Sequence, residues 1–220
     1  MSDCTKNRIE MAIKEIPAVV QISAPNIKTF DAKIIGTAPY VQLRFSEKAM
    51  NSMMDKMKEG STAKGKKARA ARDFDEDFKQ ALHVSEEGWY GIPAGAFRNA
   101  MVDACRLVAY PMTKAKLSIF LAHDGLDQID GTPMIRIEGK PEKMISAVRN
   151  ATGVADMRVR ARFNPWSAVL RINFDADQFK MSDVANLLMR VGMQVGIGEG
   201  RPNSKSSCGM GFGTFSLVME

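Results

Sequence analysis

The stretch Asp183–Val218 reads DVANLLMRVGMQV, then GIGEGRPNSKSSCGMGFG, then TFSLV. In its first part, apolar side chains recur at the three-and-four spacing of one helical face. These are Val184, Leu187, Leu188, Val191 and Val195. Six glycines follow between Gly196 and Gly213, and the run Thr214–Val218 has the composition of a short strand. The order helix, glycine-rich loop, strand therefore predicts that an α+β fold closes at this end of the chain.

The glycine-rich loop, Gly196–Gly213, combines bare backbone with positive charge. Because glycine has no Cβ, its backbone can approach a phosphate closely, and Arg201 and Lys205 add charge beside it. Neither familiar nucleotide motif fits, because the spacing before Lys205 is not that of a P-loop and a dinucleotide motif needs glycines that open a helix. We interpret the loop as a contact for a phosphate backbone, with a solvated turn as the alternative. Its candidate residues are Gly196, Gly198, Arg201, Lys205, Gly209 and Gly211.

The net charge of +6 lies in one segment. Lys56–Arg72 holds seven cations against Glu59 alone, so the remainder of the chain is formally neutral. Its lysine-, alanine- and glycine-rich composition cannot build a core, which predicts a flexible basic insertion at about residues 57–82. We interpret it as a nucleic-acid arm, with a merely solubilising loop as the alternative. Its candidate residues are Lys64, Lys66, Lys67, Arg69 and Arg72. The acidic run Asp73–Asp77 after it favours a helix start over a metal site.

A second group of cations lies on one predicted strand, Ala155–Phe163. Arg158, Arg160 and Arg162 alternate with apolar residues, so their side chains emerge on the same face. Three neighbouring cations repel one another, which indicates an anionic partner. Nucleic-acid phosphates and acidic residues on an adjacent strand are both consistent with the pattern.

The remaining periodicity predicts one domain over residues 1–220. The expected strands are Lys28–Phe45 (broken at Gly36 and Pro39), Lys116–Ala122, Met134–Glu138, Met144–Arg149, Ala155–Phe163 and Ala168–Phe174. The expected helices are Glu47–Met57, with a methionine stripe facing the core, Asp75–Leu82 and Ala94–Ala109. This order predicts a modified ferredoxin-like (RRM-like) antiparallel sheet with helices on one face.

Composition narrows the class of protein further. No apolar run is long enough to cross a membrane, and the start of the chain lacks the apolar core of a signal peptide. The three cysteines are widely spaced and form no CxxC pair, which argues against a structural zinc and a disulfide scaffold. We therefore expect a cytoplasmic protein with no cofactor, no metal and no membrane partner.

Two segments together resemble a known family. Gly91–Met101 reads GIPAGAFRNAM and resembles the helix opening of RAMP-superfamily proteins, in which a basic residue, here Arg98, follows a proline-glycine-serine turn. The superfamily includes the RNA-binding backbone subunits of CRISPR effector complexes. Leu187–Phe215 resembles its C-terminal glycine-rich loop, and the likeness extends over roughly Lys28–Glu220. Ala94–Ala96 departs from the usual glycine and serines, and the glycine-rich loop is longer, which indicates a divergent, stand-alone relative such as a phage could encode.

The resemblance implies single-stranded RNA or DNA held along the sheet and the glycine-rich loop, with the basic insertion as a thumb. It also implies copies that polymerise along the strand as a homo-oligomer or filament. We expect sequence-independent binding, RNA rather than DNA, and no catalysis. Two alternatives stay open. Some RAMP relatives cut RNA without metal, for which His83 or His123 would serve, and a phage single-strand DNA annealing or recombination protein would share the basic insertion.

Overall fold

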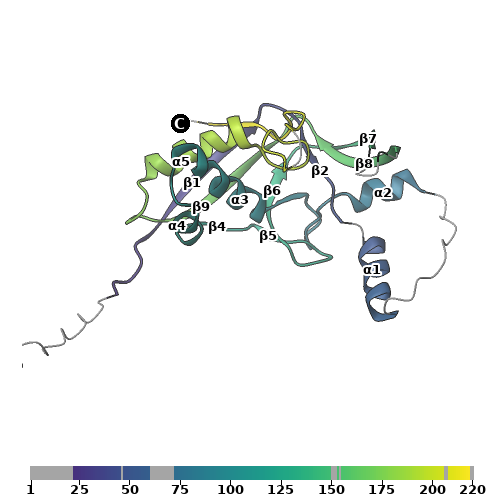
Figure 1. Ribbon diagram of the computed structural model, residues 1–220, viewed down its shortest axis with the longest axis horizontal. Coiled ribbons are helices and arrows are strands. Elements are labelled where there is room, and N and C mark those ends of the chain that lie inside the picture. Colours follow the sequence, from purple (N-terminus) through teal and green to yellow (C-terminus); the bar gives the residue numbers. More distant parts are fainter. Residues whose placement is uncertain are drawn as a thin grey trace, which may run out of the picture.

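The computed structural model describes residues 22–45, 47–59, 72–149, 153, 155–205 and 208–218. The chain is an α+β protein with two antiparallel sheets (Figure 1). Its elements are β1 (Ile27–Gly36), β2 (Tyr40–Gln42), α1 (Glu47–Glu59), α2 (Phe74–Gln80), β3 (Gly91–Pro93), α3 (Ala94–Ala104), η2 (Cys105–Val108), α4 (Met112–Ser118), β4 (Ile119–Leu121), β5 (Gly125–Leu126), β6 (Pro133–Glu138), β7 (Pro141–Arg149), β8 (Ala155–Phe163), β9 (Ser167–Asp175), α5 (Met181–Arg190), η3 (Val191–Val195) and β10 (Phe215–Leu217).

The larger sheet has the strand order β10-β1-β9-β6-β3, with β4 also paired to β9 and β5 to β6. Strands β1 and β9 pair from Ile27 opposite Asp175 to Ile35 opposite Ser167. Strand alternation turns Ile34 and Leu170 into the core, where neither is exposed, and leaves Lys33 and Val169 on the other face. Helices α3 and α5 pack on the inner face, so the opposite face of the sheet is open to solvent (Figure 1).

The predicted helical face of Asp183–Val195 is the buried one. Val184, Leu187, Leu188, Val191 and Val195 are all at most 5% exposed. The helix starts two residues earlier than expected, because the Asp183 carboxylate accepts a hydrogen bond from the backbone amide of Lys180 at 3.0 Å. Its last turn widens into the π-helical η3, which ends at Val195 and has Gly196 as its C-cap.

One predicted strand and one predicted buried face are wrong. Lys116–Ala122 was expected as a strand, but α4 occupies its first part and only Ile119–Leu121 is extended. Pro111 starts this helix, and Ala115 and Ser118, one turn apart, face the core. The methionine stripe of α1 does not face the core either: Met53, Met54 and Met57 are 51%, 49% and 82% exposed. The reason is that α1 stands away from the body of the protein (Figure 1).

The smaller sheet, β2-β8-β7, is a long hairpin attached to the core at one end. Phe163, at the end of β8, pairs with Tyr40 of β2, and both side chains are at most 2% exposed. Helix α2 lies beside β8. As expected for the acidic run, Asp73 caps α2 by accepting from the backbone amide of Asp75 at 2.9 Å. The Lys143 ammonium hydrogen-bonds Asp75 from β7 and holds the pKa of that carboxyl below its usual range.

Candidate nucleic-acid interface

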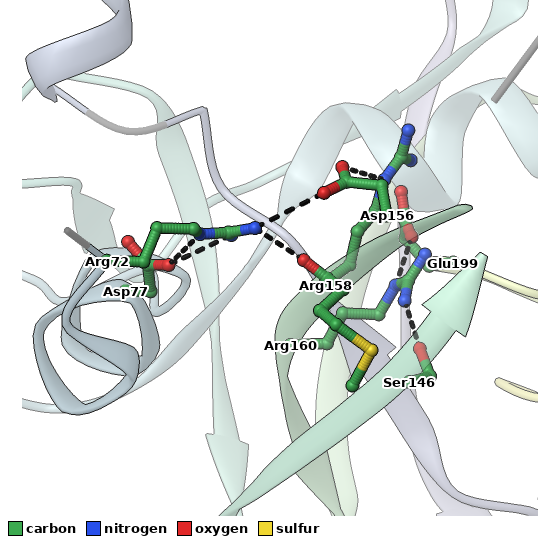
Figure 2. Close-up of polar contacts among 8 residues, drawn as sticks. Arg72, Asp77, Ser146, Asp156, Arg158, Arg160 and Glu199 are labelled. Atoms are coloured by element: carbon green, nitrogen blue, oxygen red, sulfur yellow. Dashed lines mark hydrogen bonds and ion pairs between the residues drawn. The ribbon is translucent and has the colours of Figure 1, made fainter. Parts of the chain in front are cut away.

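The three arginines of β8 share one face of the hairpin, as the alternation predicted. Strand β8 pairs with β7 so that Arg162 lies opposite Glu142 and Arg158 opposite Ser146. Residues directly opposite in an antiparallel pair project from the same face, so this face carries three guanidinium groups together with polar side chains of β7. Figure 2 shows Arg158 and Arg160 side by side on β8.

Each of these arginines has an acidic partner. Arg162 Nη2 lies 2.6 Å from Glu142 Oε2 on β7, and Arg158 Nε lies 3.9 Å from Asp156 Oδ2 on β8 itself. Arg160 Nε donates to Glu199 Oε2 at 2.6 Å, and its Nη1 donates to Ser146 Oγ at 2.7 Å. Acidic residues on an adjacent strand were one of the two explanations that the sequence left open, and Glu142 alone fits it, because Asp156 lies on β8 itself and Glu199 in the glycine-rich loop.

Exposure separates Arg160 from the other two. The Arg160 side chain is 7% exposed, whereas those of Arg158 and Arg162 are 41% and 43% exposed. The Glu199 carboxylate and the Ser146 hydroxyl satisfy donors of this buried guanidinium, so removal of the guanidinium would leave both groups without their partner. Because Glu199 belongs to the glycine-rich loop, Arg160 ties that loop to the hairpin. The two exposed guanidinium groups keep donors that a phosphate could reach.

Arg72 fixes the end of the basic segment against this hairpin. Its Nη2 lies 2.9 Å from Asp77 Oδ2, and its Nη1 donates to the backbone oxygen of Met157 at 2.6 Å (Figure 2). Asp156, 3.4 Å from the same Nη1, joins Arg72 to the neighbourhood of Arg158. The chain therefore returns from the basic segment directly beside β8. The other predicted residues of that segment, Lys64, Lys66, Lys67 and Arg69, lie outside the described residues.

The glycine-rich loop folds onto itself and onto β2, which differs from the expected row of bare amides. The Glu199 amide donates to Val41 O at 2.8 Å, and the Met210 amide donates to Gly200 O at 2.7 Å. Gly198 has φ +76°, and a Cβ there would lie 2.5 Å from Val41 O. Gly211 has φ +74°, but a Cβ there would meet nothing within 4 Å. Much of the glycine content thus serves close packing and turns within the loop.

The remaining predicted loop residues occupy different surroundings. Gly196 is the C-cap of η3, and its amide donates to Val191 O at 2.7 Å. Gly209 lies against the backbone of Arg201, which itself donates from Nη1 to Gly198 O at 3.0 Å. Lys205 is exposed.

Arg98, the basic residue of the proline-containing motif, is not brought together with the hairpin arginines. It donates from Nε to Ile119 O at 2.9 Å and from Nη2 to Lys116 O at 2.6 Å. Its guanidinium carbon lies 5.1 Å from the centre of the Phe120 ring. These contacts attach α3 to the C-terminal end of α4, where a cation is favourable to the helix dipole.

A pocket of about 280 Å³ lies between β2, α3 and the glycine-rich loop. Its polar lining includes Gln42, His83, Asn99, Asp103, Glu199 and Arg201. His83 Nδ1 lies 2.8 Å from Asp127 Oδ2, and the Asp127 side chain is 1% exposed. The buried Asp127 carboxylate also lies 3.3 Å from Arg44 Nε. Its contact with Nδ1 orients the imidazole ring, whose other nitrogen is Nε2. His123, by contrast, is exposed and has no hydrogen-bond partner among the described residues.

Sequence reasoning missed two residues that organise this region, Glu199 and Asp127. The sequence offered a reason to single out Glu199, because it is the only carboxylate between Gly196 and Gly213. The sequence offered no such reason for Asp127, because its partner His83 lies 44 residues away in the chain. Across the part of the chain that the structure describes, no group of three or more His, Cys, Asp or Glu could hold a metal ion. Nor does any described helix have the length and apolar character needed to span a membrane.

Comparison with protein-family models found no match, and comparison with curated proteins found no significant relative.

Proposed function

We propose that the protein binds single-stranded nucleic acid, RNA in preference to DNA, without sequence specificity, and that copies assemble along the strand in the cytoplasm. The binding surface consists of the basic segment Lys56–Arg72, the exposed arginines of β8, and Arg201 and Lys205 of the glycine-rich loop. Arg160 and Arg98 support the fold in this proposal, because their donors face carboxylates, a hydroxyl and backbone oxygens within the protein.

The strand order supports a RAMP-type, modified ferredoxin-like fold. A ferredoxin-like sheet places its four strands in the spatial order fourth, first, third, second, with a helix after the first and third strands. Here β1 is followed by α3, then β4 and β6, then β9, α5 and β10, and the sheet runs β10-β1-β9-β6. The proline-containing motif opens α3 and the glycine-rich loop joins α5 to β10, which are the positions that the resemblance implies.

The position of Arg72 is the observation that carries the proposal. The basic segment holds the entire net charge, and Arg72 attaches its end to β8 beside two exposed arginines. The cations of the hairpin are neutralised by nearby carboxylates, so the surplus charge that attracts a phosphate backbone comes from the segment. An exposed guanidinium paired with a carboxylate in water gains little from that pair, so it can exchange the carboxylate for a phosphate at little cost.

Salt dependence of binding tests the proposal. In the variant Lys64→Ala, Lys66→Ala, Lys67→Ala and Arg69→Ala, affinity for labelled single strands should fall for all sequences alike. If four contacts are lost, the slope of log affinity against log salt should decrease by about 3, at roughly 0.7 per phosphate contact. Fluorescence anisotropy between low and moderate salt measures both quantities.

The matched control removes the same charge elsewhere. Lys28, Lys33, Lys114 and Lys140 are all exposed and lie outside the proposed surface, so their quadruple alanine variant should keep a slope close to that of the wild type. If affinity and slope fell equally in the two variants, binding would depend on the net charge of the protein and not on the basic segment, which would contradict the proposal. An unchanged slope in the first variant would remove the basic segment from the binding surface. Faster annealing of complementary DNA strands, with no preference for RNA, would instead favour the recombination alternative.

The His83–Asp127 pair favours a second candidate, a metal-independent endoribonuclease. A histidine oriented by a buried carboxylate is the usual arrangement of a general base, and Arg201 lines the same pocket. In such a reaction His83 would take the proton of a ribose 2′-hydroxyl, whose oxygen attacks the phosphorus while the bond to the 5′-oxygen breaks and the leaving 5′-oxygen takes a proton from water. The products would be a 2′,3′-cyclic phosphate and a free 5′-hydroxyl.

Gel analysis of labelled RNA with the purified protein separates this candidate from binding alone. Cleavage that is lost in His83→Ala and kept in His123→Ala would establish the nuclease. Binding of intact RNA without products, in the wild type and in both variants, would exclude it. Circular dichroism of His83→Ala controls for loss of folding, because the ring contacts a buried ion pair.

A further inference from the structure

A groove of about 730 Å³ separates η2 from the continuous helix formed by α5 and η3. It lies on the helical side of the protein, away from the hairpin arginines. Leu187 and Phe179 form its buried floor, and Val108 and Met193 are 48% and 77% exposed at its rim. The Tyr110 hydroxyl in this groove is shielded from solvent and has no hydrogen-bond partner among the described residues. A groove of this kind, with apolar walls and a tyrosine hydroxyl that can still form a hydrogen bond, is suited to bind an amphipathic chain segment.

The N-terminal part of this chain has the matching pattern. Residues 1–21 lie outside the described part of the chain, and their sequence places Ile9, Ala12, Ile13 and Ile16 at the spacing of one helical face, just before Pro17. Glu10, Lys14 and Glu15 fill the positions between them, together with Met11. The segment therefore has an apolar stripe and, apart from Met11, a charged opposite face, which is the pattern of a segment that docks into a groove.

The described residues before β1 lead away from the surface of the protein. The backbone oxygen of Asn26 accepts from the Ala176 amide at 2.8 Å, close in the chain to the groove residues Gln178 and Phe179. Before that contact the chain leaves the surface: residues 22–26 are all exposed, Ile22 at 89%, and Figure 1 shows them running away from the body. The outward course of residues 22–26 favours the groove of a second copy over the groove of the same copy as the docking site.

We propose that the apolar stripe of residues 9–16 docks into the α5–η2 groove of a second copy of this chain. The self-association that the proposed function invokes then has a defined interface, but this interface needs no nucleic acid. The two proposals can therefore fail separately. Exchange of such segments joins copies without requiring a large preformed interface.

Sedimentation velocity without nucleic acid tests this docking. The full-length protein should associate, and Met193→Lys should weaken association about tenfold or more, because an ammonium at the rim opposes burial of the apolar stripe. Leu117→Lys is the matched control, since Leu117 is equally exposed at 78% but does not line the groove. It should associate like the wild type. Ile13→Lys combined with Ile16→Lys should weaken association as much as Met193→Lys does.

Mixing the two defective variants is the decisive step. Met193→Lys copies keep an intact segment, and the Ile13→Lys, Ile16→Lys copies keep an intact groove. An equimolar mixture should therefore form a one-to-one heterodimer, although neither variant associates alone. A monomeric wild type would overturn the proposal, and so would failure of the mixture to associate. Loss of stability in Met193→Lys without any change in association would place the segment in the groove of its own copy, which also contradicts it.

Discussion

Glu199 and Arg160 join two parts of the protein that lie 39 residues apart in the chain. Glu199 stands in the glycine-rich loop, and Arg160 stands in the middle of β8. Because the guanidinium is almost fully buried and also donates to Ser146, any movement of the loop relative to the hairpin breaks a charge-assisted hydrogen bond. At Glu199 the glycine-rich loop is therefore held to the hairpin through its side chain and to β2 through its backbone amide.

This pairing predicts unequal effects for two arginines on the same strand. Arg160→Ala leaves Glu199 and Ser146 without their partner, and the free energy of unfolding should fall by about 2 kcal/mol. Arg162→Ala breaks an exposed pair and should cost under about 1 kcal/mol. Urea denaturation of both variants measures the difference. Equal stability losses would mean that burial of Arg160 does not contribute, and lower strand affinity in Arg162→Ala alone would support its contact with phosphate.

Gly198 and Gly211 provide a second comparison, because their φ angles are nearly equal at +76° and +74°. Alanine at either position suffers the same left-handed backbone strain, about 1 kcal/mol. Only at Gly198 does the added Cβ collide with the backbone oxygen of Val41 and the Tyr40 ring. Gly198→Ala should therefore lower the melting temperature distinctly more than Gly211→Ala, as measured by circular dichroism. Identical melting temperatures would show that the loop moves freely away from β2.

The strands and helices that were predicted correctly are those whose periodicity is set by burial on one face. The bounds of β8 match the expectation, and the apolar face of α5 with η3 is the buried one. The predictions for α4 and for the buried face of α1 failed because neither segment has a long periodic pattern that burial enforces. In α4 only two positions face the core, too few to distinguish a helix from a strand by period, and the apolar stripe of α1 has no buried surface to pack against among the described residues.

Residues of the candidate site could be predicted to lie together only where they belong to the same strand or the same loop. Alternation alone put Arg158, Arg160 and Arg162 on one face. It could not assign Glu199 to Arg160 or Asp127 to His83, because those pairings depend on how distant segments fold together. The expectation of an open amide surface failed for a similar reason: glycine content does not reveal whether the backbone faces a ligand or another part of the same loop.

Helix α2 depends on Asp73, which connects Arg72 to the helix. Asp73→Ala should remove the cap and lower the free energy of unfolding by about 1 kcal/mol. Asp73→Asn should retain most of the stability, because an asparagine side chain also accepts from the first helical amides. Thermal denaturation compares the two variants with the wild type. Equal losses in both would attribute the effect to charge and not to capping.

Phe45, the last described residue before α1, and Arg72, the first described residue after it, lie at nearly the same place on the body of the protein. Phe45 and Arg72 line one cavity of about 340 Å³, and the Arg44 amide donates to Ala81 O at 3.1 Å. Replacing residues 46–71 by a short glycine-serine linker should therefore change the free energy of unfolding by no more than about 1 kcal/mol, because loop-closure entropy varies slowly with length. Affinity for single strands should be lost. Urea denaturation and anisotropy measure the two effects, and a large loss of stability would show that α1 is needed for folding.

The shared exit and return point also has a consequence for how such a protein can change over generations. Between Phe45 and Arg72 the chain can gain, lose or recode residues without disturbing the pairing of β1 with β9 or of β7 with β8. Selection on ligand preference and selection on foldability therefore act on different residues. Descendants of one ancestor could diverge in this segment until its sequences no longer align, while the sheet beneath stays the same.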